Sequence, residues 1–257
     1  MNIYQHFRPE EREYIDRVLQ WKEYVEQTYS PKLTDFLDPR EQHILKVLIG
    51  SSADVKWELY GGQPDSERKR ALLLPDYGEA KEEDFQIGLY EIEYPSKFLK
   101  IEHPQVLGSL MSLGLTRSKF GDILIKDNRA QFFVAHEVTD YVHIQLESIG
   151  RAKVSLKELP LKDAISFAHA WTEQSITVTS LRLDTVISGI HNISRQKSQL
   201  LIQQSLAKIN WTTIENPSFD CAEGDLLSVR GYGRAKILSI EGKTKKDKWR
   251  MMVGVQK

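Results

Sequence analysis

The stretch that decides the fold of the last third of the chain is LRLDTVISGIHNISRQKSQLLIQQSLAKIN (181–210), followed by GDLLSVRGYGRAK (224–236). Apolar residues recur at helical spacing in its first part, at Leu183, Val186, Ile187 and Ile190. This spacing predicts a helix with one apolar face. A second helix is expected after Ser194, whose hydroxyl is a good N-cap, with Leu201 and Ile202 as its buried positions.

Two cations, Arg195 and Lys197, fall in the first turn of this second helix. Positive charge at that place opposes the helix dipole by a few tenths of a kcal/mol. A bound polyanion would reverse the sign of the local field and offset that cost, whereas side chains that point into solvent would only tolerate it. Spacing alone leaves both interpretations open.

The order of motifs in this stretch resembles the alpha-L RNA-binding motif of small-subunit ribosomal protein four, some pseudouridine synthases and bacterial tyrosyl-tRNA synthetases. The matching positions are Arg182, Leu183, Asp184, Ser194, Arg195, Leu201, Ile202, Lys208, Asn210, Gly224, Asp225, Val229 and Arg230. Two positions depart from the family pattern, because Ser205 stands where Gly is usual and Trp211 follows Asn210 where Gly is common. Serine ends a helix less comfortably than glycine, so a weaker C-cap is expected there.

The resemblance implies that the C-terminal region binds RNA, mostly through phosphates and by shape more than by sequence. The residues that we assign to RNA binding on this basis are Arg182, Asp184, Ser194, Arg195, Lys197, Lys208, Asn210, Arg230, Tyr232, Arg234 and Lys236. Gly231 and Gly233 flank Tyr232, which would let the backbone approach a sugar-phosphate chain closely. A plain glycine turn explains that pattern nearly as well.

Two strands, at 236–241 and 249–255, are expected after the motif, and they form a hairpin. Its tip is basic, with Lys243, Lys245, Lys246 and Lys248. Each lysine that meets a phosphate would release about one counterion, so binding to RNA should depend steeply on salt.

The charges of the chain are unevenly distributed. Residues 181–257 hold 13 Lys or Arg against 7 Asp or Glu, a balance of +6, which leaves 22 basic and 29 acidic residues and a balance of −7 for residues 1–180. A basic third on an acidic body is typical of a localised phosphate-binding surface. The alternative is a charged surface that is merely solvated.

Composition excludes several classes of protein. In 257 residues, 40% hydrophobic and 28% charged side chains predict a soluble globular protein of one large domain or two to three small ones. No apolar run approaches the ~20 residues that span a bilayer, and the start MNIYQHFRPEE does not resemble a signal peptide. Cys221 is the only cysteine, so no internal disulfide is expected, and the cytoplasm is the expected compartment.

The N-terminal region, residues 1–80, is predicted to begin with two helices. The first is expected over 9–29, with a proline at its first turn and acidic residues after it. The second is expected over 39–48, because Asp38 is a good N-cap ahead of a proline and Gly50 ends the pattern.

A hairpin is predicted after these helices. VKWELYGG (55–62) alternates apolar and polar residues before a glycine turn, and ALLLPDYG (71–78) resembles its partner strand. The charged link QPDSERKR (63–70) is either a solvent loop or an RNA contact, and its composition favours the loop.

Residues 81–175 are predicted to form a ferredoxin-like (RRM-like) domain. Segments of strand, helix, strand, strand, helix and strand character follow one another at 85–94, 104–115, 122–125, 131–135, 137–150 and 152–159. Sheets of this kind that bind RNA stack bases on aromatic residues of their central strands. Phe132 and Phe133 point to opposite faces, so only one of them could do so, and core packing is the expected role of both.

Two segments in these regions, TDFLDPREQ (34–42) and HPQVLGSLMSLGLTRSKFGDI (103–123), resemble the bacterial YlmH (RqcP) family, in which two such parts precede an alpha-L domain. The resemblance then spans nearly the whole chain. It implies a cytosolic, ribosome-associated RNA binder that helps to rescue obstructed large subunits carrying a peptidyl-tRNA, where it assists non-templated alanine tailing. It implies rRNA, tRNA and the large subunit as partners, with the nascent-chain tailing factor as a further candidate.

No arrangement of residues predicts catalysis, a cofactor or a metal. His136-Glu137 lacks the second His of a zinc-protease helix, and a single Cys with scattered His gives no zinc-site spacing. No glycine-rich loop for phosphate or a dinucleotide is present. Asp184 resembles the catalytic Asp of pseudouridine synthases only superficially, and a structural role is favoured; the same holds for His103 and His136.

We therefore predict an α+β protein of three regions: an N-terminal α+β region (1–80), an RRM-like domain (81–175), and an alpha-L RNA-binding domain of two helices on a small sheet (176–257). The leading hypothesis is a monomeric, non-catalytic RNA-binding protein of the ribosomal large subunit, with no cofactor, metal or membrane attachment. The alternative is an RNA-modifying enzyme, of pseudouridine synthase or methyltransferase type, that its C-terminal domain targets to RNA. A pure protein–protein adaptor is a third possibility.

Overall fold

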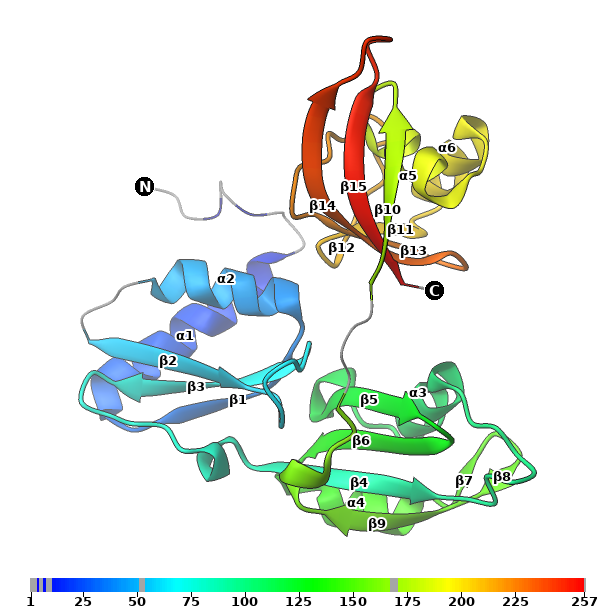
Figure 1. Ribbon diagram of the computed structural model, residues 1–257. Helices are drawn as coiled ribbons and strands as arrows, with labels where there is room; N and C mark the ends of the chain where they lie inside the picture. The colour runs from blue at the N-terminus through cyan, green and yellow to red at the C-terminus, as the bar shows by residue number, and fades with distance from the viewer. Residues whose placement is uncertain (1–3, 5–6, 8–10, 51–53, 167–170, 257) are drawn as a thin grey trace. The chain divides into compact units, whose positions relative to one another are not determined.

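The protein is described by a computed structural model that covers residues 4, 7, 11–50, 54–166 and 171–256. The chain folds as two compact units, Met1–Phe167 and Ala168–Lys257. Each unit combines helices with antiparallel sheets, as Figure 1 shows, which confirms the predicted α+β class.

The first unit contains two sheets, and the first of these belongs to what we call the N-terminal lobe. The elements of this lobe are α1 (Arg12–Thr28), β1 (Lys32–Leu37), α2 (Pro39–Ile49), β2 (Val55–Tyr60) and β3 (Lys69–Pro75). The strands pair in the order β1-β3-β2. Both helices pack on one face of this sheet, around a core that includes Ile15, Val18, Ile44, Leu45 and Leu73.

Local signals set most boundaries of the N-terminal lobe. Asp38 caps α2 through a hydrogen bond from the Glu41 amide, and the Glu41 carboxylate accepts from the Asp38 amide in return. Gly50 ends that helix with a φ of 58°. These findings confirm the second helix and the hairpin, whereas the predicted start of the first helix at Pro9 lies outside the described residues. Strand β1 had not been predicted.

The second sheet of the first unit belongs to what we call the RRM-like lobe. Its main elements are β4 (Ile87–Glu93), α3 (His103–Ser112), β5 (Phe120–Lys126), β6 (Arg129–Ala135), α4 (Thr139–Gln145) and β9 (Ser155–Leu159). Short elements join them: η3 (Glu82–Phe85), η4 (Arg117–Lys119), η5 (His136–Val138), β7 (Ser148–Ile149), β8 (Ala152–Lys153) and η6 (Leu161–Asp163).

The strands of the RRM-like lobe pair in the order β5-β6-β4-β9, and every pairing is antiparallel. The succession of strands and helices is the one predicted from the sequence. Helices α3 and α4 pack on one face of the sheet, around a core that includes Tyr90, Val106, Leu110, Phe132 and Val142.

The second unit is a six-stranded sheet with two helices on one face (Figure 1). Its elements are β10 (Thr172–Val178), α5 (Leu183–His191), α6 (Arg195–Gln203), β11 (Ala207–Ile209), β12 (Thr212–Thr213), β13 (Leu226–Val229), β14 (Gly233–Lys243) and β15 (Trp249–Gln256). The strand order is β10-β15-β14-β13-β11-β12. The sheet is thus wider than expected, and the predicted boundary between residues 175 and 176 runs through β10, which pairs with β15 along its whole length.

The two helices of the second unit lie where the periodicity placed them. Leu183, Val186 and Ile187 are fully buried, and so is Ile202 of α6, while Leu201 is partly buried against the same core. The two departures from the alpha-L pattern fall where the backbone is left-handed: φ is 59° at Ser205 and 65° at Trp211. Glycine adopts this conformation without strain, which explains why the family favours it at both positions.

Candidate nucleic-acid interface

Asp184 joins the two helices of the second unit. Its side chain is fully buried at the start of α5. Arg182 donates to both of its carboxylate oxygens at 3.2 Å, and Arg195 of α6 donates at 3.0 Å. Gln199, one turn further along α6, donates at 2.8 Å. The carboxylate therefore fixes the positions of Arg182 and Arg195, two of the arginines assigned to RNA binding from the sequence.

These donors also set the charge of the cluster. Burial alone would raise the pKa of Asp184, but the hydrogen bonds from Arg182, Gln199 and Arg195 outweigh it and hold the pKa well below its usual range. The carboxylate is therefore ionised, and two guanidinium groups around it leave one positive charge. The side chains of Arg182 and Arg195 are 35% and 53% exposed, so both still reach solvent.

Asp184, Ser194 and Asn210, which the sequence assigned to RNA binding, have structural roles within the protein. Asp184 was assigned to RNA binding, but it is fully buried, and a carboxylate without exposed area does not meet a ligand. Ser194 caps α6 by accepting from the Lys197 amide at 3.2 Å. The Asn210 amide donates to Asp225 at 2.8 Å and accepts from the Leu226 amide at 2.9 Å, so it holds the β11–β12 turn against β13.

A second group of predicted residues gathers beside the helices. The Lys197 ammonium lies 5.5 Å from the centre of the Tyr232 ring, and that ring lies 5.3 Å from the ring of His191 at the end of α5. Burial lowers the pKa of His191, so this imidazole is neutral at pH 7. Arg230 is exposed two residues before Tyr232. The Lys197 ammonium and two rings therefore meet on what we call the helix side of this unit, the face that carries α5 and α6.

The remaining predicted cations lie on the opposite face of the sheet, which we call the outer face. Lys208 pairs with Ser228, and Ser228 pairs with Arg234, so the side chains of this row share one face. Lys236 follows Arg234 at the two-residue period of a strand. The residues between them, such as Ala235 and Ile237, are buried in the core under the helices. The cations predicted from the sequence thus divide between two faces and do not form a single surface.

The RRM-like sheet offers no aromatic platform. Phe132 packs among the helices of its lobe, and Phe133 packs on the other face with Phe36 of β1 and Ile165. Both phenylalanines are completely buried, which confirms the prediction that each one packs in a core. Packing over Phe133 is close: a Cβ added at Gly62 would lie 2.4 Å from its ring, and one at Gly121 would lie 2.8 Å from the Phe36 ring.

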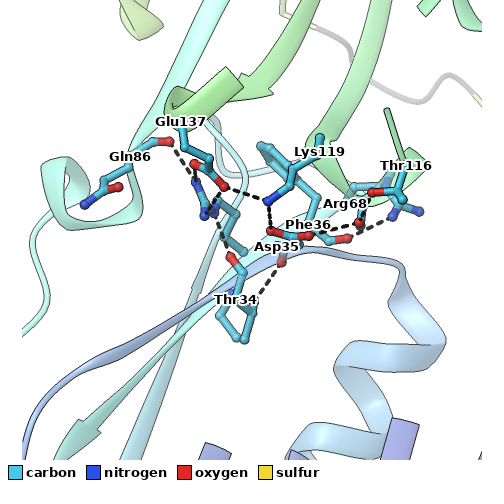
Figure 2. Close-up of polar contacts among 11 residues, drawn as sticks. Thr34, Asp35, Phe36, Arg68, Gln86, Thr116, Lys119 and Glu137 are labelled. Atoms are coloured by element: carbon cyan, nitrogen blue, oxygen red, sulfur yellow. Dashed lines mark hydrogen bonds and ion pairs between the residues drawn. The ribbon is translucent and has the colours of Figure 1, made fainter. Parts of the chain in front are cut away.

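A polar network fixes the N-terminal lobe over this sheet. Figure 2 shows the Lys119 ammonium between the carboxylates of Asp35 and Glu137, at 2.7 and 3.0 Å. Arg70, which is 3% exposed, donates to Glu137 at 3.1 Å and to the Thr34 carbonyl at 2.7 Å. Burial opposes ionisation of Glu137, but hydrogen bonds and these two cations lower its pKa all the same.

Asp122 of β5 anchors the charged link of the N-terminal hairpin. Its carboxylate accepts from the backbone amides of Glu67 and Arg68 at 2.6 and 3.0 Å, and burial raises its pKa. The Arg68 guanidinium donates to the Phe36 carbonyl at 2.9 Å. The sequence leaves two interpretations of the link 63–70 open, a solvent loop or an RNA contact. Arg68 and Arg70 fit neither interpretation, because both side chains form hydrogen bonds in this contact between the lobes.

The part of the same sheet face that the N-terminal lobe leaves open is a hollow of about 450 Å³. Glu91, Glu93 and Asp163 line it together with Arg129 and Lys157. Arg129 is already paired with Glu91. Acidic groups outnumber basic ones there, so the net charge of this hollow is negative and disfavours phosphate.

Within the described residues, no group of three or more His, Cys, Asp or Glu side chains is placed to hold a metal ion. None of the helices in that part of the chain is long and apolar enough to cross a membrane.

Comparison with known proteins covers the whole chain. Residues 10–77 match the family description "YlmH, N-terminal", and residues 80–163 match "Putative RNA-binding domain in YlmH". The chain is 47% identical over 256 residues to the ribosome-associated protein quality control protein P2 of Bacillus subtilis, which covers all of this chain and 99% of that protein. A solved structure, the cell division protein ylmH from Streptococcus pneumoniae, is 37% identical with a TM-score of 0.55 and spans 64% of this chain and 100% of its own.

Proposed function

The chain belongs to the YlmH family, and from this premise we propose that it is a non-catalytic RNA-binding protein of ribosome-associated quality control. The observation that carries the proposal is the 47% identity, end to end, with a protein named for that process. The family description that matches residues 80–163 is likewise one of RNA binding.

In its finer form, the proposal is that the protein binds rRNA and tRNA on the large ribosomal subunit in the cytoplasm. There it assists the alanine tailing of stalled nascent chains and works beside the tailing factor, as a monomer. This finer form follows from the family resemblance and from the net charge of +6 in residues 181–257. An excess of positive charge in one part of a chain attracts the phosphate backbone.

The helix side of the second unit is the surface that supports this role best. Arg182 and Arg195 are held in fixed positions by Asp184, so little conformational freedom is lost when they meet phosphate. Lys197 is exposed with its ammonium over the ring of Tyr232, and Arg230 is exposed two residues before that tyrosine in the chain. Guanidinium groups form paired hydrogen bonds with phosphates, and an aromatic ring stacks on unstacked bases, so this set of side chains is suited to single-stranded or looped RNA.

The test is binding to purified bacterial large ribosomal subunits. Charge reversal at Arg182 or Arg195 would also disturb the buried Asp184, so the better variant is Lys197→Glu/Arg230→Glu, which changes two exposed side chains. We expect its Kd to rise by about tenfold or more, because two phosphate contacts become repulsions. The matched control is Lys46→Glu/Lys56→Glu, the same change of charge at exposed positions of the N-terminal lobe.

An affinity of the Lys197→Glu/Arg230→Glu protein equal to that of the wild type would contradict this assignment of the surface. A covalent change in RNA after incubation with the protein, seen as a shift in its mass, would contradict the non-catalytic role. Binding that survives nuclease digestion of the rRNA would point to a protein partner instead.

A further inference from the structure

The β14–β15 hairpin bears a hollow that the alpha-L pattern does not account for. The hollow has a volume of about 670 Å³ and lies at the tip of the hairpin, where its lining includes Lys243, Thr244, Lys245, Lys246, Lys248 and Arg250. Thr177 of the neighbouring strand β10 lies directly opposite Arg250 in the register and also lines the hollow, as do Gly242 and one acidic residue, Glu241.

Most of the positive charge in this hollow is not neutralised. Lys243 is paired with Asp247 at 2.7 Å, and its ammonium also lies over the ring of Trp249. Lys245, Lys246 and Lys248 are exposed, and their ammonium groups make no ion pair within the part of the chain that the structure describes. Cations brought so close together repel one another, and a bound polyanion relieves that repulsion.

The lysines stand on a turn of defined shape. The Thr244 amide donates to the Lys248 carbonyl at 2.7 Å, and the Asp247 amide donates to the Thr244 carbonyl at 2.9 Å. The Lys248 amide is held in addition by the Thr244 hydroxyl at 3.2 Å. Backbone positions fixed in this way lower the entropy lost when the side chains meet a ligand.

The outer face of the sheet carries further cations. Met251 and Val253 are buried under α5 and α6, so Arg250, directly before Met251 in the strand, points to the other face by alternation. Lys208, Arg234 and Lys236 lie on that same face, as their register shows. These cations therefore share a face of the sheet with Arg250, and the hairpin tip lies beyond the other end of β14.

We propose that this hairpin tip and the outer face form a second RNA-binding surface, which takes the phosphate backbone of a different RNA segment from the one held on the helix side. The proposal rests on the proposed function, since it assumes that the protein binds RNA. Regularly spaced phosphates match a row of lysines and arginines, and the hydroxyls of Thr177 and Thr244 donate to phosphate or sugar oxygens. A domain with two such surfaces holds two RNA segments at a fixed separation.

The test compares Lys245→Gln/Lys246→Gln/Lys248→Gln with the wild type in binding to purified bacterial large ribosomal subunits, between about 50 and 200 mM KCl. Three lost phosphate contacts should raise the Kd by about tenfold at the lower salt and reduce the slope of log K against log salt by about 2 to 3. The thermal unfolding temperature should be unchanged, because the three side chains are exposed and unpaired.

The matched control is Lys245→Arg/Lys246→Arg/Lys248→Arg, which keeps the charge and should keep the affinity and the salt slope. A glutamine variant that binds like the wild type overturns the second surface and leaves the proposed function standing, and equal losses in both variants overturn it too, since charge is then not the cause. A wild-type protein that does not bind large subunits overturns the proposed function together with this inference. Binding that withstands nuclease assigns the hairpin to a protein partner, which also overturns it.

Discussion

Two sheets of this protein carry helices on one face, and they differ in what happens on the other. In the RRM-like lobe the second face is covered by β1 and the hairpin link of the N-terminal lobe, and its open remainder is acidic. In the second unit the outer face bears the basic side chains of Lys208, Arg234, Lys236 and Arg250, and Trp171 packs on it over Gly254. The order of strands therefore does not indicate which sheet face is free for RNA. Whether other elements cover the second face is the better indicator.

The pattern of apolar and polar residues along the strands accounts for this difference. Strand β6, RAQFFVA, has apolar residues on both faces, and all of them are buried. Strand β14, GRAKILSIEGK, begins with alternation between basic residues, the half-buried Arg234 and the exposed Lys236, and the buried apolar residues Ala235 and Ile237. A strand that is apolar on both faces needs two covering layers, whereas an alternating strand needs only one.

The largest loss of stability is expected for Phe133→Ala, which tests whether the second face of the RRM-like sheet is a packed core. Truncation of a fully buried phenylalanine leaves a cavity between the lobes and should cost about 3–5 kcal/mol of unfolding free energy, measured by urea denaturation. Phe98→Ala is the control, because that ring is 86% exposed and its loss should change stability by less than about 0.5 kcal/mol. A stable Phe133→Ala protein that binds RNA more weakly would mean that this face is open to RNA after all.

The next effect in size is expected for Asp184→Asn. The substitution leaves two guanidinium groups without their shared carboxylate, and we expect a cost of about 3 kcal/mol at pH 7. Asp247→Asn is the control, since that carboxylate is 80% exposed in its pair with Lys243 and should contribute less than about 1 kcal/mol.

The stability difference between the wild type and Asp184→Asn should depend on pH, in a direction that follows from the pKa of Asp184. The pKa of Asp184 is lower in the folded protein than in the unfolded chain. Its ionisation therefore stabilises the fold above the unfolded value of about 4, and that contribution is lost as the pH falls below it. The gap in thermal unfolding temperature between wild type and Asp184→Asn should be wide at pH 7 and should close below about pH 4. A gap that stays constant down to pH 3 would show that the carboxylate does not act through its charge.

The smallest effect is expected for Arg129→Gln/Lys157→Gln in the acidic hollow of the RRM-like sheet. Arg129 is 52% exposed in its pair with Glu91, so the change should cost less than about 1 kcal/mol. Affinity for large subunits and its salt slope should match the wild type, in contrast to the hairpin variant. A reduced salt slope would place RNA on this face and remove the distinction between the two sheets.

The sequence predicted the short-range features well, because capping and periodicity act within a few residues. Asp38 and Ser194 cap the helices expected of them, and Leu183, Val186 and Ile187 form the buried stripe of α5. Strand β1 was missed because its alternation is mixed: Thr34 and Phe36 are buried, while Asp35 between them pairs with Lys119. Lys119, the partner that explains the polar Asp35, lies 84 residues away in the sequence.

Several properties of the candidate interface follow from tertiary contacts alone. Arg68 and Arg70 look like surface cations in a charged link, yet both are held between the lobes by groups that are distant in the chain. The burial of Asp184 depends on α6 packing against α5, and the split of the cations between two faces depends on the register of β11, β13 and β14.

By itself the sequence determined the α+β class, the capped helices, the strands of the RRM-like lobe and the excess of positive charge in the last third. Those features depend on residues a few positions apart, or on composition. Only the tertiary structure decided which cations face solvent, which carboxylates neutralise them and which sheet keeps an open face. Each of these depends on side chains that come together through folding, and their separation in the chain carries no local signal.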